Sequence, residues 1–260
     1  MAKHEIIIKD FNLFCEVMKS TAKIVDSAKF ILSDVGLEIY GAHGRIARCE
    51  ITTNAISSKE PFSFAVESLS TFNKIISTVK EVHDGDYSGL KFTYDGSSIR
   101  FSSKKFKTKF TTQVEETISK WISKKVETVM QPLFEFTTTP DFIKRLNNHS
   151  FMFTNAKDVR VYLETNSEME NNVVFATLGN KNVEIGNEMT LKFGLVNAGV
   201  VPEGKSIIID FERLNLFNTV QVNDIKIAYT NYNCLVSKNS VSGKDGAFFN
   251  LNMYCTLLKS

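Results

Sequence analysis

Residues 64–76 read FAVESLSTFNKII, and residues 209–220 read IDFERLNLFNTV. In each stretch a short apolar run is followed by apolar residues three or four positions apart, which is typical of a strand that leads into an amphipathic helix. The two stretches align without a gap, and this recurrence predicts that the chain contains an internal duplication. The matched pairs are Phe64 with Ile209, Val66 with Phe211, Glu67 with Glu212, Leu69 with Leu214, Phe72 with Phe217 and Asn73 with Asn218.

The segments around this repeat predict the same order of elements in both halves of the chain. Asp10 is a good N-cap for a helix at 11–23, and Ser68 caps the next helix. A third helix, at 140–149, starts with a proline, whose missing N–H would be unpaired there anyway. The Asp95-Gly96 pair between two β-rich runs predicts a tight hairpin. Strands are expected at 5–9, 29–35, 37–42, 46–52, 62–66, 90–94, 98–102, 106–114, 134–138, 151–154, 158–164 and 173–178.

This pattern predicts an α+β fold made of two similar domains, each with antiparallel sheets and two short helices. We place the N-terminal domain at 1–114, an interdomain connector at 115–132 and the C-terminal domain at 133–260. The connector contains the only tryptophan of the chain and alternates apolar with charged residues. Either an extended segment on the surface or a helix fits its spacing.

The composition is that of an ordinary folded protein, with 43% hydrophobic and 23% charged residues in a chain of 260. Lys and Arg total 31 and Asp and Glu total 29, so a net charge of +2 does not favour a uniformly basic nucleic-acid-binding molecule. Any electrostatic function therefore depends on how the charges are placed. No signal peptide and no apolar run of about 18 residues is apparent, so we expect an intracellular protein with no membrane partner.

Nothing in the sequence points to catalysis. The four cysteines never form a C-x-x-C pair and the four histidines are scattered, so neither a disulfide nor a zinc site is expected. The phosphate-loop, dinucleotide, zinc-protease and nucleophile-elbow motifs do not occur. His43 lies between two glycines and is better explained as a turn residue than as a catalytic one. We expect no enzymatic activity, no catalytic residue, no metal and no cofactor.

Over nearly its whole length the sequence resembles a DNA sliding clamp of the proliferating cell nuclear antigen type. None of the similar segments is a catalytic fingerprint, so the resemblance rests on their order and spacing. The segments are IIIKDFNLFCEVMKSTAKIV at 6–25, GLEIYGAHGRIARCEI at 36–51, FAVESLSTFNKIISTV at 64–79 and LKFTYDGSSIRFSSKKFKTKFTTQ at 90–113.

The resemblance implies a non-enzymatic processivity factor that forms a closed ring, as a homotrimer, around double-stranded DNA. Its implied partners are a DNA polymerase, other replication proteins and a clamp loader. The divergent, Lys- and Asn-rich sequence suggests a viral or phage member. Two alternatives stay open: a monomeric viral-type processivity subunit that grips DNA by a basic face, and a duplicated β-rich protein-interaction module without DNA binding.

If the apolar face of each helix is buried, the polar faces of all four helices are exposed, and basic and amide residues outnumber acidic ones there. Such residues suit phosphate contact without base reading, which allows sliding. A single exposed lysine is more often only solvated. The residues predicted to contact DNA are Lys19, Lys23, Asn73, Lys74, Lys80, Lys144, Arg145, Asn148 and Arg213.

A second basic cluster interleaves lysines with phenylalanines at 101–110. This pattern fits a single-stranded nucleic-acid platform, or an edge strand whose lysines discourage aggregation. The clamp resemblance adds a third interpretation, in which the strand pairs with the segment at 173–178 of the next subunit. The residues predicted for this subunit interface are Phe106, Lys107, Phe110, Val174 and Phe175.

The resemblance also implies a pocket beneath the connector, where a short partner peptide adds its backbone and inserts apolar side chains. Apolar residues of this kind are individually more often part of a core. Carried over by position, the pocket residues are Ala42, Ile46, Val126, Val129, Met130, Tyr254 and Leu257.

Overall fold

The computed structural model describes residues 3–44, 46–113, 130–149, 160–165, 172–179, 189–199, 207–219 and 223–257. The chain divides into two compact units, each described separately below. The first is Met1–Glu127 with Ser240–Asn252, and the second is Thr128–Asn239 with Met253–Ser260. Most of the predicted connector and the predicted strand at 151–154 lie outside the described residues.

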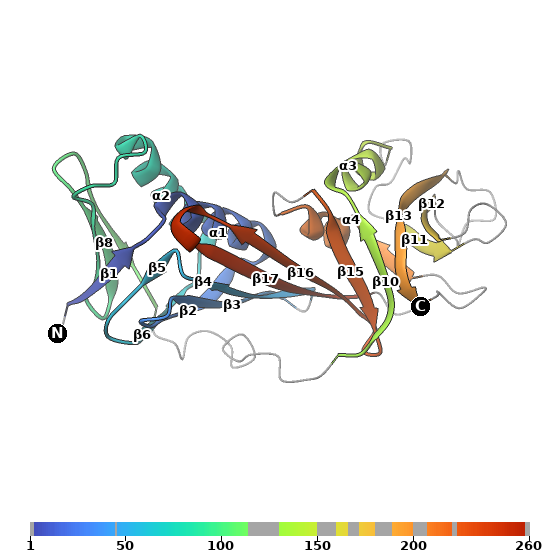
Figure 1. Ribbon diagram of the computed structural model, residues 1–260, viewed down its shortest axis with the longest axis horizontal. Coiled ribbons are helices and arrows are strands. Elements are labelled where there is room, and N and C mark those ends of the chain that lie inside the picture. Colours follow the sequence, from blue (N-terminus) through green and yellow to red (C-terminus); the bar gives the residue numbers. More distant parts are fainter. Residues whose placement is uncertain are drawn as a thin grey trace. The chain divides into compact units, whose positions relative to one another are not determined.

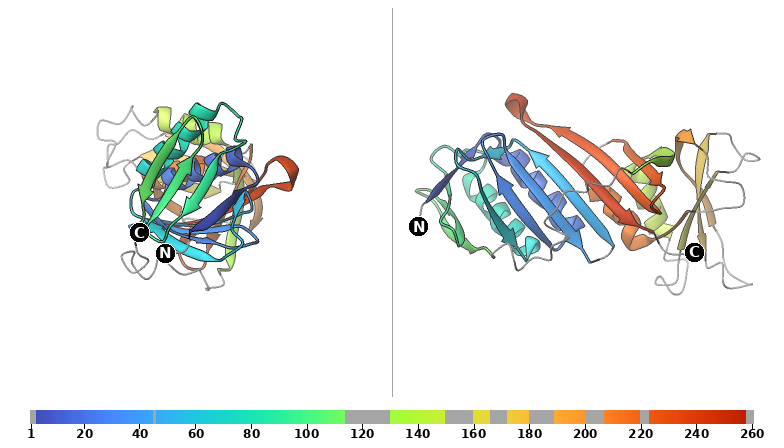
Figure 2. Two further views of the ribbon diagram at one scale, coloured as in Figure 1. Left: turned by 90° about the vertical axis from the view of Figure 1, so that its left-hand side faces the viewer. Right: turned by 90° about the horizontal axis from the view of Figure 1, so that it is seen from below.

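The described residues of the first unit form two antiparallel sheets and two α-helices (Figure 1), with a 3-10 turn at Lys244–Gly246. One sheet has the order β5-β1-β7-β8-β9; the other has the order β6-β2-β3-β4, with β17 beyond β4. The helices pack against each other, and Figure 2 (right) shows them behind the strands. The elements are β1 (His4–Ile8), α1 (Phe11–Ile24), β2 (Ser27–Leu32), β3 (Leu37–His43), β4 (Ala47–Thr53), β5 (Ile56–Ser57), β6 (Phe62–Val66), α2 (Leu69–His83), β7 (Lys91–Tyr94), β8 (Ser98–Ser102) and β9 (Lys107–Thr111).

Both helices of this unit begin at the predicted caps. The carboxylate of Asp10 accepts the Leu13 N–H at 2.9 Å, and the Ser68 hydroxyl accepts the Thr71 N–H at 3.4 Å, which satisfies amide groups that the first turn leaves unpaired. The apolar face of each helix is buried, so its polar face is exposed. The buried helix residues include Phe14, Val17, Met18, Leu69, Phe72, Ile76 and Val79.

The second unit has the strand order β14-β11-β12-β13-β10-β15-β16, with the end of β17 beyond β16. Here too the two helices pack against each other (Figure 1). The elements are β10 (Pro132–Thr138), α3 (Pro140–His149), β11 (Arg160–Thr165), β12 (Val173–Gly179), β13 (Met189–Gly199), β14 (Ile207–Asp210), α4 (Phe211–Leu216), a 3-10 turn (Phe217–Thr219), β15 (Ile225–Thr230), β16 (Cys234–Ser242) and β17 (Phe248–Thr256).

The predicted α+β fold class, with short helices and antiparallel sheets in two similar halves, is confirmed. The gapless repeat alignment is shifted in the helix, however. It places Ser68 opposite Arg213, whereas in the structure the cap corresponding to Ser68 is Asp210. The reason is that Asp210 both ends β14 and caps α4, while Glu67 separates β6 from its cap.

The sequence analysis missed β13. Its N-terminal part pairs with β12 and its C-terminal part pairs with β10, so one strand of the second unit takes the places that β4 and β5 take in the first. Apolar Met189, Leu191 and Phe193 alternate with polar Thr190 and Lys192, which is a strand signal that could have revealed it.

Residues 240–252, which the sequence analysis assigned to the second domain, group with the first unit in the structure. Hydrogen bonds hold them there. The Phe248 carbonyl accepts the Thr53 hydroxyl at 2.6 Å and the Asn54 N–H at 3.4 Å, and the Lys244 N–H donates to Asp10 at 3.1 Å. The outer edge of β4 is thereby covered.

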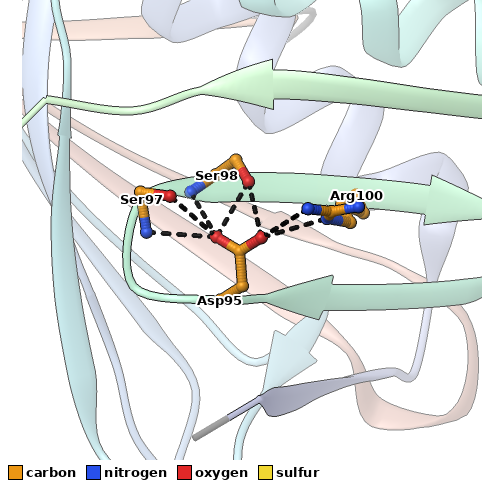
Figure 3. A network of polar contacts seen from close by, with 4 residues as sticks. All are labelled: Asp95, Ser97, Ser98 and Arg100. Atoms are coloured by element: carbon orange, nitrogen blue, oxygen red, sulfur yellow. Dashed lines mark hydrogen bonds and ion pairs between the residues drawn. The ribbon is translucent and has the colours of Figure 1, made fainter. Parts of the chain in front are cut away.

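The predicted Asp95-Gly96 hairpin is confirmed, and one carboxylate organises it (Figure 3). Asp95 accepts the Ser98 hydroxyl and N–H at 2.8 Å, the Ser97 N–H at 3.1 Å and Arg100 Nε at 3.0 Å. The hydrogen bond from the Ser98 hydroxyl, aided by the other donors, holds the pKa of Asp95 well below its usual range.

Asp95→Asn is expected to lower the thermal midpoint at pH 7, because an amide accepts fewer of these hydrogen bonds. A depressed pKa contributes stability that is present above the ordinary Asp pKa of about 3.9 and is lost as the pH falls through the folded-state pKa. The difference between wild type and variant should therefore shrink below about pH 4. Melting curves across this pH range measure it, with the exposed turn residue Asp34→Asn as control; an equal midpoint at pH 7 contradicts the role of Asp95.

Candidate nucleic-acid interface

The polar face of the α1–α2 pair holds five of the residues predicted to contact DNA. Lys19, Lys23 and Lys74 are exposed, whereas Asn73 and Lys80 are half-buried. The three exposed ammonium groups extend from rigid helices whose opposite faces are fixed in the core. They are therefore available for contact with phosphates.

The groove between α1 and α2 is less favourable to an anion than the lysines alone suggest. Within this cavity of about 450 Å³, Lys19 and Lys80 face the three carboxylates of Glu16, Glu81 and Asp84. Lys80 Nζ lies 3.9 Å from a carboxylate oxygen of Glu16. Phosphate contact by these two helices would therefore come from the exposed lysines and not from half-buried Lys80, which lies beside Glu16.

In the second unit, α3 presents Lys144, Arg145 and Asn148 to solvent. The Arg145 guanidinium lies 5.8 Å from the centre of the Phe142 ring, which restricts its direction. Ile143 and Leu146 on the opposite face are buried.

The structure places Arg213 less favourably for contact with DNA than the other predicted residues. Its guanidinium pairs with Asp210, the N-cap of α4, and its side chain is only 14% exposed. Because this charge is already paired within the helix start, we remove Arg213 from the residues proposed to contact DNA.

The strand β9 ends the first sheet, and its outer edge is open among the described residues. Thr112 donates its N–H to Ser97, and the Phe106 carbonyl accepts from Ser103, at 2.9 and 2.8 Å. Because backbone groups of successive strand residues alternate between edges, those of Lys107, Lys109 and Thr111 face the open edge.

The predicted partner strand is corrected too. β12 pairs with β11 on one side and with β13 on the other, so Val174 and Phe175 have no open strand edge. Both of these residues are buried. In the described part of the chain, the segment 189–193 of β13 has a strand neighbour on one side, β12, whereas 194–199 also pair with β10. Phe106 and Phe110 are half-buried beside the open edge of β9, and Lys107 is exposed.

A cavity of about 420 Å³ lies in the second unit, and two residues predicted for the peptide pocket, Met130 and Tyr254, are in its lining. The rest of the lining combines a small apolar surface with charges. It includes Pro132, Glu135, Lys226, Ile227, Ala228, Val236 and Lys238.

The other predicted pocket residues are placed differently. Leu257 is 9% exposed and donates its N–H to the Asn233 carbonyl at 3.2 Å. Ala42 is buried and Ile46 half-buried, both in the first unit. Val126 and Val129 lie outside the described residues.

All four cysteines are buried, and burial raises the pKa of Cys15, Cys49 and Cys255 to about 12 and that of Cys234 to about 11. Among the described residues, no three metal-binding side chains converge. No described helix has the length and apolar character to span a bilayer.

Within the described residues, each unit has two helices packed together and mainly antiparallel sheets, which defines a duplicated α+β protein. No protein-family model matches the sequence, and no curated protein matches it significantly. Solved structures do match: the proliferating cellular nuclear antigen of Entamoeba histolytica has a TM-score of 0.66 at 17% identity, covering 99% of both chains.

Two further structures agree over almost the whole chain. The PCNA of A. fulgidus, solved with the C-terminal region of FEN-1 bound, has a TM-score of 0.66 at 10% identity, over 100% of this chain and 99% of that one. A PCNA2–PCNA3 complex from Sulfolobus tokodaii matches with a TM-score of 0.60 at 12% identity, over 98% and 99%. The chain has the fold of a sliding clamp of the proliferating cell nuclear antigen type.

Proposed function

We propose that this protein is a non-enzymatic DNA sliding clamp, a homotrimeric ring that encircles duplex DNA and tethers a DNA polymerase and other replication proteins to it. A clamp loader would place the ring on DNA inside the cell, and a viral or phage source fits the sequence. The observation that carries the proposal is the pair of open strand edges, one on β9 and one on β13, in a chain with the clamp fold.

The structure itself suggests how these edges meet. β4 and the first part of β13 hold equivalent places in the two units, as do β9 and β17, the last strand of each half. The outer edge of β4 is covered by β17. By equivalence, β9 of one copy would cover the edge of β13 at 189–193 in the next. Such pairing would use the β9 edge and the β13 edge of every copy in a head-to-tail contact, which gives a ring when the rotation between copies closes.

The helix faces supply the second part of the proposal. Exposed Lys19, Lys23, Lys74, Lys144 and Arg145 would make individually weak, sequence-independent contacts with phosphates. A ring held by its closure and not by tight contacts could slide along any sequence. Retention on DNA whose ends are blocked, compared with open DNA, tests the proposal: a ring stays on the blocked molecule and leaves the open one.

The cavity lined by Met130 and Tyr254 is the proposed docking site for partner peptides. It has a small apolar floor, at Ile227 and Val236, and charged residues at Glu135 and Lys238. An apolar anchor with polar contacts around it is a common way to hold a short peptide.

Ala228→Phe is expected to weaken peptide binding by at least about tenfold, because the added ring fills part of the cavity. Fluorescence anisotropy with a labelled peptide of the C-terminal region of FEN-1, the partner in the A. fulgidus structure, measures the loss. Thr93→Phe, a replacement in β7 of the other unit, is the control and should leave binding unchanged. Equal affinity for the wild type and Ala228→Phe would place the peptide elsewhere.

A further inference from the structure

Within the described residues of the first unit, a basic cleft lies outside the helix faces. A cleft of about 900 Å³ opens between the end of α2, the loop that follows it and the turn joining β8 to β9. Four lysines line it, Lys91, Lys104, Lys105 and Lys107, together with a single carboxylate, that of Asp86. The groove between α1 and α2 has two lysines and three carboxylates, so the cleft is the stronger attractor of anions.

The four ammonium groups are not used in holding the fold together. All four lysines are exposed, and none forms an ion pair with another residue in the described part of the chain. Arg100 of the neighbouring hairpin differs, because Asp95 pairs with it at 2.9 Å. Hydrogen bonds from Ser88 lower the pKa of Asp86, and the charge of Lys105 adds to this effect. No second acid in the cleft lining offsets the remaining lysines.

The turn that carries Lys104 and Lys105 and leads to Lys107, the first residue of β9, is fixed in place. The Ser103 hydroxyl accepts the N–H groups of Lys105 and Phe106, both at 3.2 Å, and lies 2.9 Å from Nε2 of His83. His83 is buried, with Nδ1 2.8 Å from the Val79 carbonyl in α2. Hydrogen bonds therefore hold the backbone that carries these lysines, and the cleft is preorganised in the absence of a ligand.

We propose that this cleft binds backbone phosphates of DNA, as a second contact beside the helix faces; the proposal rests on the DNA-encircling function proposed above. The lining offers point charges and serine hydroxyls but no exposed aromatic ring for stacking on a base. Duplex DNA carries one negative charge per about 1.7 Å of its axis, so neighbouring phosphates can meet several of these lysines at once. Contacts of this kind add affinity without sequence preference.

The test neutralises Lys104, Lys105 and Lys107 to Gln in the full chain and follows binding of a labelled duplex by anisotropy over a series of salt concentrations. The slope of log K against log salt is negative, and each lost phosphate contact makes it shallower by about 0.9. The triple variant should therefore have a slope smaller in magnitude by about 2 to 3. The matched control neutralises three exposed lysines of the same unit outside the cleft, Lys3, Lys59 and Lys244. Replacement of the three cleft lysines by Arg should restore the slope.

A direct measurement accompanies the variants. Acetylation of the wild-type lysines, read by mass spectrometry, should be slowed by DNA at Lys104, Lys105 and Lys107 and unchanged at Lys59. The proposal is supported if the salt slope is shallower for the cleft variant than for the control variant and DNA protects the three cleft lysines. Equal slopes with no protection overturn it while the proposed clamp function stands. A wild-type chain that binds no DNA overturns both proposals. Inorganic phosphate that protects the lysines as well as DNA does, at equal phosphate concentration, would assign the cleft to free phosphate and also overturn the proposal.

Discussion

Lys109→Pro is expected to convert a trimer of about 88 kDa, three copies of the 29.3 kDa chain, into a folded monomer. The backbone of Lys109 faces the open edge of β9. Proline therefore removes an N–H donor from the proposed contact with β13, and its ring hinders the approach of the neighbouring strand. A loss of about 1.4 kcal/mol, close to one hydrogen bond, weakens each contact about tenfold. Because a closed ring has three such contacts, the overall assembly constant should fall by about a thousandfold.

Two neighbouring variants make this result specific. Lys109→Ala keeps the N–H and should remain a trimer. Thr108→Pro removes a donor that faces β8, so it should destabilise the first unit itself, seen as a lower thermal midpoint. Sedimentation equilibrium gives the masses. If the wild-type chain is a strict monomer at micromolar concentration, the ring proposal is contradicted and the monomeric alternative stands. If Lys109→Pro is still a trimer, the subunits contact each other through another surface.

The second large effect concerns how the protein stays on DNA. A linear duplex with biotin at both ends lets a ring thread on, and streptavidin added afterwards traps it. Protein added before streptavidin should survive a wash at about 1 M salt, where the screening length is only about 3 Å and electrostatic contacts are lost. Protein added after streptavidin should wash away. Equal retention in either order contradicts topological binding.

Neutralising the basic residues of the helix faces separates the electrostatic contribution to DNA binding from retention by a closed ring. Replacement of Lys19, Lys74, Lys144 and Arg145 by Gln should reduce the magnitude of the slope of log K against log salt for initial binding by about 3 to 4, at about 0.9 per contact. The fraction trapped after blocking should still resist the high-salt wash, because closure of the ring does not depend on these charges. An unchanged slope would show that the four residues do not face DNA.

Local signals in the sequence predicted much of the fold. The caps at Asp10 and Ser68 and the Asp95-Gly96 turn are short-range features whose geometry depends on a few neighbouring residues, and the structure has all three. The long strand β13 was missed although its alternation is visible, since Gly194 interrupts the pattern where the strand changes partners.

The candidate sites were harder to predict, because they depend on pairing between distant segments. The sequence shows that 173–178 forms a strand, but not that β11 and β13 cover both of its edges. Arg213 has the composition of a phosphate ligand, and only the cap at Asp210 reveals that its charge is already paired. The sequence shows Lys104, Lys105 and Lys107 as a cluster. Only the fold shows that Lys91 lines the same cleft and that Asp86 is the single acid in its lining.

The placement of residues 240–252 in the first unit has a consequence for biosynthesis. A ribosome releases residues 1–127 long before it makes the segment that covers β4, so the nascent first unit exposes an uncovered strand edge during that interval. Uncovered edges are where chains join wrongly. Completion of the first unit therefore waits until residues 240–252 have been translated, and a chain shortened before them would leave the edge of β4 uncovered.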